Sequence, residues 1–419
     1  MPFDPVRIRE HFPALAIEDH DKPRVYLDGP AGTQVPRTVI DRTVDYLVNH
    51  NANGGGAFRT ARATDAISTE AHLFMADFLN APSPLEIVFG PNMTTLTYQI
   101  SRSLGKIFRP GERLMVTRMD HDANVYPWVQ LAEDLGLEVL WLPFDTGTFR
   151  FDPEAFRQLL EQGVRLVAFC MASNALGTIN PVKEMCRMAR EAGALSYVDA
   201  VQYAPHGPID VQDLGCDFLV CSAYKFFGGH QGILWGREEL LSELYPYQVR
   251  PAAAKLPKRF ETGTQSFEGQ AGVIGALSYL AWLGETQAAE FQTQFDHLKS
   301  RPRILHAAMA GIQAYEKKLV EHLLTGLTGI PGIRVYGITA SQDLHWRVPT
   351  VAITREGRKP AEMVRQLAAE NIFAWAGHYY AVEVVKHLGL ALEEGMVRLG
   401  IVHYNTAAEI DRCLEVIGS

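Results

Sequence analysis

LSYVDAVQYAPHGPIDVQDLGCDFLVCSAYKFFGG, residues 195–229, holds two short apolar runs separated by a polar, turn-rich stretch. The first run ends at Asp199 and the second at Ser222, with Lys225 shortly beyond it. Asp199 and Lys225 are 26 residues apart, which is about one strand–helix–strand step. Because ligands of parallel sheets bind at the carboxyl ends of the strands, both residues are expected near one ligand-binding edge.

The same alternation of apolar runs and helical patterns extends over residues 85–236. It predicts an α/β fold with a mainly parallel sheet covered on both faces. The predicted strands are Glu86–Phe89, Arg113–Met119, Glu138–Phe144, Arg165–Met171, Leu195–Asp199, Asp217–Ser222 and Gly232–Trp235. The predicted helices between them include Asp122–Leu135, Pro153–Glu161 and Pro181–Ala192.

The pattern changes after Gly236 and predicts a second, smaller α+β domain. Residues 269–328 have a helical pattern, and strand-like runs and further helices follow. We expect a large domain over residues 20–285 and a small domain formed by residues 1–19 and 286–419. The later elements are strands Thr350–Thr354 and Met396–His403 and helices Pro360–Ala369 and Thr406–Ile417.

The composition is that of a soluble globular protein, with 47% hydrophobic and 21% charged residues among 419. The net charge of −9 argues against a broad nucleic-acid surface. No apolar run reaches the roughly 20 residues of a membrane span, and the N-terminus MPFDPVRIREHF is charged. The five cysteines match no zinc template. We therefore expect a cytoplasmic protein with no metal site.

Hydroxyl residues and a histidine follow two of the predicted strands. Thr94 and Thr95 open a predicted helix, whose free N–H groups and dipole favour a phosphate group. Simple N-capping is the alternative reading of these threonines. His121 could stack on an aromatic ring or move protons, or it could be a structural histidine.

An aspartate and a lysine follow two further strands. Asp199 could pair with a protonated pyridine nitrogen, or it could cap a helix. Lys225 could be an amine nucleophile with a lowered pKa, or an ordinary lysine in a turn. Ser222 could donate to a phosphate. Each signal alone is ambiguous, but the order of hydroxyl loop, histidine, aspartate and lysine is not.

With these residues the sequence resembles the class V aminotransferase family of fold-type I enzymes, which use pyridoxal 5′-phosphate (PLP). The cysteine desulfurase-like branch is the most similar. The resemblance covers nearly the whole chain. It rests on VYLDGPAGTQVP (Val25–Pro36), SNALGTINPV (Ser173–Val182), VDAVQYAPHGPIDV (Val198–Val211), RFETGTQSFEG (Arg259–Gly269) and VRLGIVHYNTAAEID (Val397–Asp411).

The resemblance implies a role in cofactor binding for several positions. Lys225 would hold PLP as a Schiff base and shuttle the substrate Cα proton. Asp199 would pair with the pyridine nitrogen, Gln202 would contact the ring oxygen, and His121 would stack on the ring. The phosphate would be held by Thr94, Thr95 and Ser222.

The resemblance also implies a shared site and a substrate pocket. Thr264 would reach the phosphate in the partner subunit's site, because the family is typically homodimeric. Asn174 would lie beside the substrate and the ring. Arg398 would bind the substrate α-carboxylate through a bidentate fork.

One departure from the family pattern concerns the loop WAGHYYA, residues 375–381. Cysteine desulfurases carry a catalytic cysteine there, whereas this chain has Tyr380 at that position and Trp375 in place of an arginine. No cysteine occurs between Cys221 and Cys413. A phenol forms no persulfide, so Trp375, Tyr379 and Tyr380 could instead pack around a larger substrate side chain, or they could be core aromatics.

These residues predict a PLP-dependent lyase that acts on an α-amino acid by β-elimination or C–S cleavage of a cysteine-like substrate, without a protein persulfide. An aminotransferase, an amino-acid epimerase and an enzyme of β-decarboxylation or related C–C chemistry are the alternatives. A non-catalytic scaffold of the same fold is disfavoured by the complete set of Asp199, Lys225, His121 and Arg398.

Overall fold

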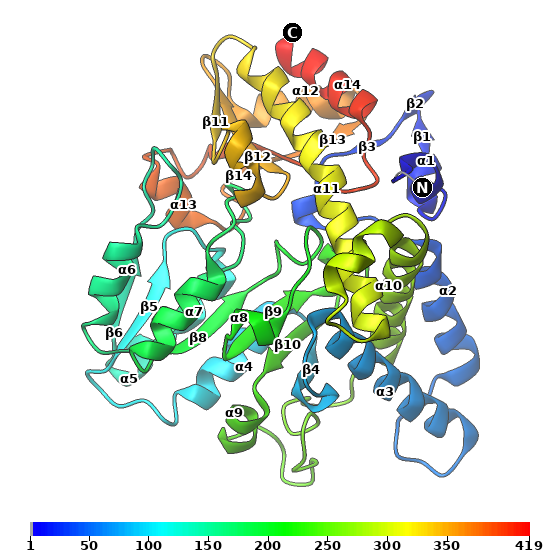
Figure 1. The fold of residues 1–419 in the computed structure, drawn as a ribbon, viewed down its shortest axis with the longest axis vertical. Helices are drawn as coiled ribbons and strands as arrows, with labels where there is room; N and C mark the ends of the chain where they lie inside the picture. Colours follow the sequence, from blue (N-terminus) through cyan, green and yellow to red (C-terminus); the bar gives the residue numbers. More distant parts are fainter. Residues whose placement is uncertain (1–2) are drawn as a thin grey trace.

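The computed structural model describes residues 3–419, and a seven-stranded sheet forms the centre of its larger part (Figure 1). The strand order is β4-β10-β9-β8-β7-β5-β6, and only β10 runs antiparallel to its neighbours. The predicted mainly parallel sheet is thus confirmed, with strand ends shifted by a few residues. The strands are β4 (Ile87–Gly90), β5 (Arg113–Thr117), β6 (Glu138–Leu142), β7 (Val164–Cys170), β8 (Leu195–Asp199), β9 (Phe218–Ser222) and β10 (Gly232–Gly236).

Both faces of this sheet are covered by helices. Alternate residues of β7 belong to different apolar clusters: Val167 and Phe169 pack in one, Leu166 and Ala168 in the other. This alternation explains why the strands are apolar throughout. The covering helices between the strands are α4 (Met93–Leu104), α5 (Tyr126–Leu135), α6 (Pro153–Leu160), α7 (Val182–Glu191) and α8 (Val211–Leu214), and α9 (Glu238–Glu243) follows the last strand.

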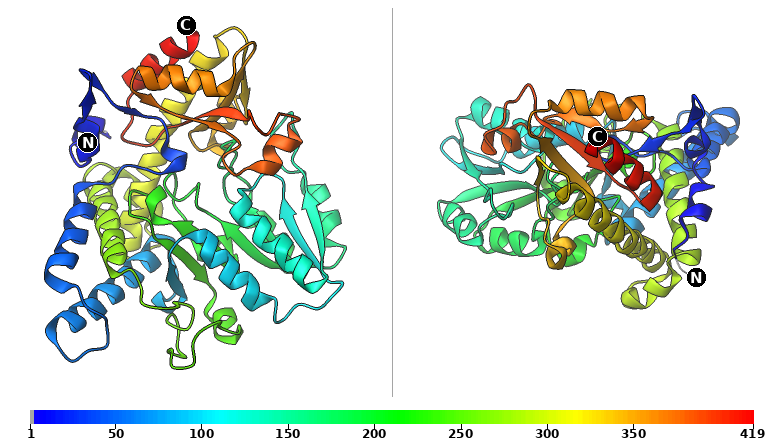
Figure 2. Two further views of the ribbon diagram at one scale, coloured as in Figure 1. Left: turned by 180° about the vertical axis from the view of Figure 1, so that it is seen from behind. Right: turned by 90° about the horizontal axis from the view of Figure 1, so that it is seen from above.

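A second, four-stranded antiparallel sheet lies at the other end of the molecule (Figures 1 and 2). It contains β11 (Ile333–Tyr336), β12 (Thr350–Arg355), β15 (Met396–Gly400) and β14 (Trp375–Gly377), in that order. This confirms the predicted smaller α+β part. The last strand ends at Gly400 rather than at His403, because the chain turns there and Asn405 N–H donates to Val402 O.

Helices flank and join the two sheets. The long helix α11 runs from the helices beside the large sheet to the small sheet (Figure 1). Residues of α11, α12 and α14 share an apolar cluster with β12 and β15. These helices are α2 (Arg37–Asp45), α3 (Arg59–Leu79), α10 (Phe267–Thr286), α11 (Ser300–Thr328), α12 (Pro360–Ala369), α13 (Val382–His387) and α14 (Ala407–Gly418).

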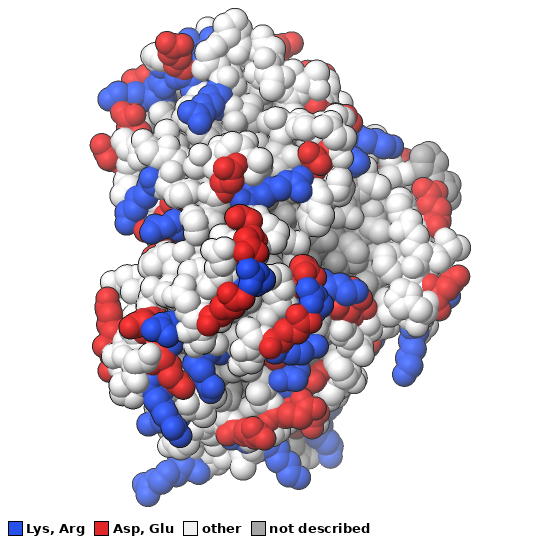
Figure 3. All heavy atoms as spheres, turned by 60° about the vertical axis from the view of Figure 1, so that its left-hand side comes forward, with Lys and Arg blue, Asp and Glu red and all other residues white. Residues whose placement is uncertain are grey.

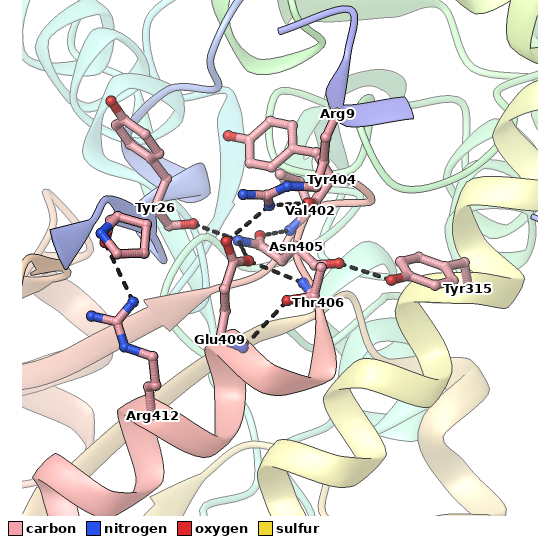
Figure 4. A network of polar contacts seen from close by, with 10 residues as sticks. Arg9, Tyr26, Tyr315, Val402, Tyr404, Asn405, Thr406, Glu409 and Arg412 are labelled. Atoms are coloured by element: carbon pink, nitrogen blue, oxygen red, sulfur yellow. Dashed lines mark hydrogen bonds and ion pairs between the residues drawn. The ribbon is translucent and has the colours of Figure 1, made fainter. Parts of the chain in front are cut away.

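Hydrogen bonds join the N-terminal region to the C-terminal helix (Figure 4). Arg9 Nη1 donates to Glu409 Oε1 at 2.8 Å, and Asn405 Nδ2 donates to Tyr26 O at 3.0 Å. Thr406 and Glu409 form a capping box at the start of α14. The domain limits at residues 20 and 286 stay a prediction. Strand β3 (Val25–Tyr26), beyond the first limit, pairs with β13 (Ile372–Phe373).

Charges of both signs are interspersed on the face that carries α6 and α7 (Figure 3). Arg157 pairs with Glu154 on α6, and Arg187 pairs with Glu184 on α7, each within one helical turn. Among residues 3–419, every helix is too short or too polar to cross a membrane. The predicted cytoplasmic location stays a prediction.

Candidate active site

A cavity of about 550 Å³ opens at the carboxyl ends of the large sheet, between it and the small sheet. The residues that line it come from widely separated segments, as expected at the strand ends of an α/β sheet. It brings together most of the predicted site residues, namely Thr94, His121, Asn174, Asp199, Gln202, Lys225, Trp375, Tyr380 and Arg398.

Lys225 lies in the short turn η6 (Ala223–Lys225) directly after β9, and its side chain is buried. Its Nζ donates to Pro30 O and lies 4.7 Å from the centroid of the Tyr224 ring. Burial lowers the pKa of Lys225 to about 7, and Arg398 adds to this lowering. A large fraction of the amine is therefore unprotonated and nucleophilic near neutral pH.

The close approach of Pro30 to Lys225 depends on Gly400. Pro30 lies in the turn η2 (Gly29–Ala31), which packs against the end of β15. A Cβ atom on Gly400 would collide with Pro30 Cδ. A side chain at this position would therefore push Pro30 away from the lysine.

Asp199 ends β8 and is buried among few hydrogen-bond donors. Its Oδ1 accepts from Val201 N–H at 2.8 Å. Burial raises the pKa of Asp199 to about 6, while the Val201 N–H and Lys225 oppose that rise. A carboxylate in such surroundings is stabilised by a cationic partner, so Asp199 is suited to bind a protonated ring nitrogen.

His121 follows β5 and has a fixed hydrogen-bond arrangement. Its Nδ1 accepts from Ala123 N–H at 3.0 Å, so the neutral ring carries its proton on Nε2. Burial lowers the pKa of His121 to about 3, and the cationic Lys225 and Arg398 add to this. The ring of Tyr380 stacks against it with centroids 5.4 Å apart. His121 thus presents a neutral aromatic surface and one N–H donor.

Arg398, in β15, is a buried guanidinium without a carboxylate partner within residues 3–419. Its Nη1 donates to Asn174 O at 3.0 Å, and its Cζ lies 4.3 Å from the centroid of the Tyr379 ring. Burial lowers the pKa of Arg398 to about 10. Asn174 Oδ1, beside it, has no hydrogen-bond partner among the described residues. The pair is therefore suited to bind a group with both an anionic oxygen and a donor hydrogen.

The residues predicted to bind a phosphate are not all in the cavity wall. Thr94 lines the cavity at the start of α4, whereas Thr95 N–H donates to Asn92 Oδ1 at 2.8 Å as part of an N-cap. Ser222 is buried at the end of β9. Thr264 lines a different cavity of about 780 Å³, together with the glycine loop at Gly54 and Gly55. Its predicted role in a partner subunit stays a prediction.

Two buried carboxyl groups close to the residues of the cavity received no role from the sequence. Asp120 precedes His121, and burial raises its pKa to about 7 despite hydrogen bonds from Thr117 and Asn124. Asp28 is another buried carboxyl whose pKa burial raises, to about 6. Asp28 and Pro30 lie in the motif LDGPAG, which does not belong to the large sheet, so the end of a predicted strand does not indicate their position.

The sequence model of the class V aminotransferases matches residues 25–301 and 303–413. The chain belongs to this family. Fold-type I architecture and dependence on PLP follow from the membership, and the protein is a PLP-dependent enzyme.

Several other proteins resemble the chain over nearly its full length. A cysteine desulfurase of Pectobacterium atrosepticum is 33% identical over 97% of this chain and 95% of its own. The aminotransferase-like protein FGM3 of Gibberella zeae is also 33% identical, over 97% and 96%. The apo structure of a cysteine desulfurase from Thermococcus onnurineus superposes with a TM-score of 0.87 at 26% identity, over 100% of this chain and 98% of that chain.

The unsatisfied polar atoms of the cavity fit the groups of PLP. Gln202 Oε1 and Asn174 Oδ1 are buried and have no hydrogen-bond partner among residues 3–419. Among residues 3–419, Asp199 forms no salt bridge with a cationic side chain, and the lowered pKa of Lys225, about 7, makes its unprotonated amine accessible near neutral pH. A class V enzyme uses such groups to hold a protonated ring nitrogen, a ring oxygen and an aldehyde carbon.

Proposed function

We propose that this class V enzyme is a PLP-dependent lyase, which eliminates a sulfur-linked β-substituent from an α-amino acid without forming a protein persulfide. The observation that carries the proposal is that one cavity holds both the Lys225 amine, whose pKa is lowered, and the Arg398 guanidinium, which forms no salt bridge with a carboxylate of residues 3–419. The 33%-identical cysteine desulfurase supports a sulfur-containing substrate.

We assign the cofactor contacts to the residues identified from the sequence. Lys225 would bind PLP covalently, Asp199 would pair with its ring nitrogen, Gln202 with its ring oxygen, and His121 with its face. Thr94, Thr95 and Ser222 would hold the phosphate. Thr264 of a second subunit would complete that phosphate site in a homodimer. Bound PLP would supply an electron sink for the carbanion at the substrate Cα.

Residues of the cavity would bind the substrate and transfer its Cα proton. Arg398 would bind the substrate α-carboxylate, with Asn174 beside it, and thereby orient the Cα–H bond. The Lys225 amine would take the Cα proton, since its lowered pKa makes it a competent base near pH 7. The Cβ–S bond would then break with its electron pair on sulfur. Addition of water would finally give pyruvate, ammonia and a thiol.

The thiol nearest this chemistry is unsuited to accept sulfur. Cys170 borders the cavity, but it is 3% exposed at the end of β7. Burial, with Asp120 and Asp199 nearby, raises the pKa of its thiol well above the usual value. The other four cysteines are buried as well. Since the thiolate is the form that attacks sulfur, the chain offers no ready persulfide acceptor among its described cysteines.

Product analysis tests this function directly. We expect purified holoenzyme to convert an S-substituted cysteine into equal amounts of pyruvate, ammonia and thiol, with no added keto acid. We also expect intact-protein mass spectrometry after incubation with cysteine, whose sulfur atom a persulfide-forming enzyme would transfer to itself, to show no gain of a sulfur atom. Turnover that requires a keto acid would instead identify an aminotransferase, and accumulation of the D-amino acid an epimerase. A sulfur adduct on the protein would exclude the persulfide-free route.

The outer wall of the cavity is aromatic and exposed. Trp375 and Tyr380 are 54% and 67% exposed, and Leu392 completes this side. Tyr379 and Tyr380 have φ angles of 53° and 58°, in the left-handed region. Tyr380 O accepts from Asp122 N–H at 2.7 Å, which holds the loop against the segment carrying His121. We assign Trp375 and Tyr380 to contact the β-substituent of the substrate.

Tyr380→Ala is therefore expected to change substrate preference. The ratio of kcat/KM for S-benzylcysteine to that for S-methylcysteine should fall about 2- to 13-fold, because aromatic contact is worth roughly 0.5–1.5 kcal/mol beyond area burial. Tyr380→Phe should retain most of the preference for S-benzylcysteine, since it keeps the aromatic ring. An unchanged ratio in Tyr380→Ala would remove Tyr380 from the substrate pocket. Steady-state kinetics on both substrates makes the measurement.

A further inference from the structure

Gln202, in the turn that follows β8, contacts a second buried residue of the same turn, His206. Tyr203 N–H and Ala204 N–H both donate to Ala200 O, so the chain coils there like one turn of helix. Gln202 and His206 are four residues apart and therefore lie on the same side of it. Gln202 Nε2 is 3.4 Å from His206 Nε2 and 3.0 Å from Thr350 Oγ1, at the start of β12.

His206 in turn faces a carboxyl group on α11. Its Nδ1 lies 2.8 Å from Glu316 Oε2, and the two side chains are 2% and 1% exposed. Burial raises the pKa of the Glu316 carboxyl group and so favours its neutral form. A neutral carboxyl group at this place donates to Nδ1, the ring nitrogen that lies within hydrogen-bond distance. The ring proton of His206 is then on Nε2, which makes Nε2 a donor.

A donor at His206 Nε2 determines which end of the Gln202 amide faces it. In the structure the amide nitrogen faces His206, and Gln202 Oε1 is buried without a partner within residues 3–419. The two ends of an amide are nearly isosteric, and a half-turn exchanges them. After that half-turn the oxygen would accept from both His206 Nε2–H and Thr350 Oγ1–H. The –NH₂ group would then face the cavity that Gln202 lines.

We infer that His206 and Glu316 are positioning residues, which orient the Gln202 amide so that it donates a hydrogen bond to the ring oxygen of PLP. The inference rests on the proposed cofactor contact of Gln202 but not on which reaction follows. It gives a reason for a His–Glu pair in the interior, where an apolar pair would be at least as stable. Neither residue touches the cofactor, so neither is catalytic.

Other titratable groups border the pair. His403, from the loop after β15, bonds to Tyr279 through its Nε2 at 2.6 Å. Burial lowers the pKa of His403 to about 3, so this neighbour is neutral. A cavity of about 280 Å³ adjoins the pair and has Lys317, His345 and Arg347 in its wall. Among residues 3–419, none of these three side chains hydrogen-bonds to Gln202 or to Glu316.

The test is the pH titration of the visible absorption band of PLP on Lys225, in holoenzyme without substrate. The variant is His206→Phe with Glu316→Met, because replacing both partners leaves no unpaired buried charge. A donor stabilises the anionic ring oxygen and so lowers the midpoint of the titration, and its loss raises the midpoint. We expect a rise of about one pH unit, which is tenfold in proton affinity.

A double-mutant cycle with Gln202→Met separates the mechanism from general structural change. Gln202→Met alone should raise the midpoint, and the His206/Glu316 replacement should then add nothing. A replacement that leaves the midpoint unchanged, or raises it equally in both backgrounds, would overturn the inference. If the double replacement does not fold, His206→Phe alone should still raise the midpoint, because it removes the donor that faces Gln202. A midpoint equal to that of the wild type would then overturn the inference. If the wild-type protein with added PLP shows no visible absorption band, the proposed binding of PLP to Lys225 fails, whatever the role of His206.

Discussion

Lys225→Ala is expected to abolish turnover, lowering kcat/KM by at least about 10³-fold, and to remove the visible absorption band of bound PLP. Lys225 is the only lysine in the wall of the cavity, within residues 3–419. Its amine is held by Pro30 O, and burial lowers its pKa to about 7. The same amine would bind the cofactor and move the Cα proton, and loss of a general base alone costs about 10²- to 10⁴-fold. Absorption spectra and steady-state kinetics measure both effects.

Two further variants control for charge and for general damage. Lys225→Arg keeps a cation of similar length, but a guanidinium does not deprotonate, so it should be as inactive as the alanine variant. Lys183→Ala removes a lysine that is exposed on α7 and paired with Asp213, and it should behave as the wild type. A Lys225→Ala protein that still turned over and absorbed as the wild type does would refute the assignment.

The large sheet and the residues at its strand ends could be predicted from the sequence. Buried parallel strands are continuous apolar runs, so their ends are visible, and Asp199, His121 and Lys225 each follow one. The order of these residues along the chain then placed them at one edge. Local sequence signals suffice where a side chain is positioned by the strand that immediately precedes it.

Residues brought to the cavity by long-range packing could not be predicted in the same way. Pro30 reaches Lys225 only because η2 packs against Gly400, at the far end of the chain. Glu316 lies on α11, 110 residues from His206, and nothing in the helical pattern distinguishes it. The contact between Gln202 and His206 does have a local signal in the sequence, because residues four apart lie on the same face of a helical turn. The contact between His206 and Glu316 has none.

Arg398→Ala is expected to remove the preference of the enzyme for substrates with an α-carboxylate. Wild-type enzyme should process an S-substituted cysteine far better than the matching S-substituted cysteamine, which lacks the carboxylate. Loss of a buried charge partner costs about 2–5 kcal/mol, or roughly 30- to 5,000-fold in kcat/KM. In Arg398→Ala, kcat/KM should fall by this factor for the S-substituted cysteine and only slightly for the S-substituted cysteamine. Arg398→Lys should recover only part of it, because an ammonium cannot form the bidentate fork.

Arg347 offers a matched control for this experiment. It is as buried as Arg398, at 5% exposed, and burial likewise lowers its pKa, to about 9. Its Nη atoms donate to the backbone carbonyls of Tyr336, Ile338 and Thr350, so it has a structural role. Arg347→Ala should lower the Tm but preserve the ratio of kcat/KM between the two substrates. If Arg398→Ala also preserved that ratio, the substrate carboxylate would have to bind elsewhere, and the proposed orientation of the Cα–H bond toward Lys225 would fail with it.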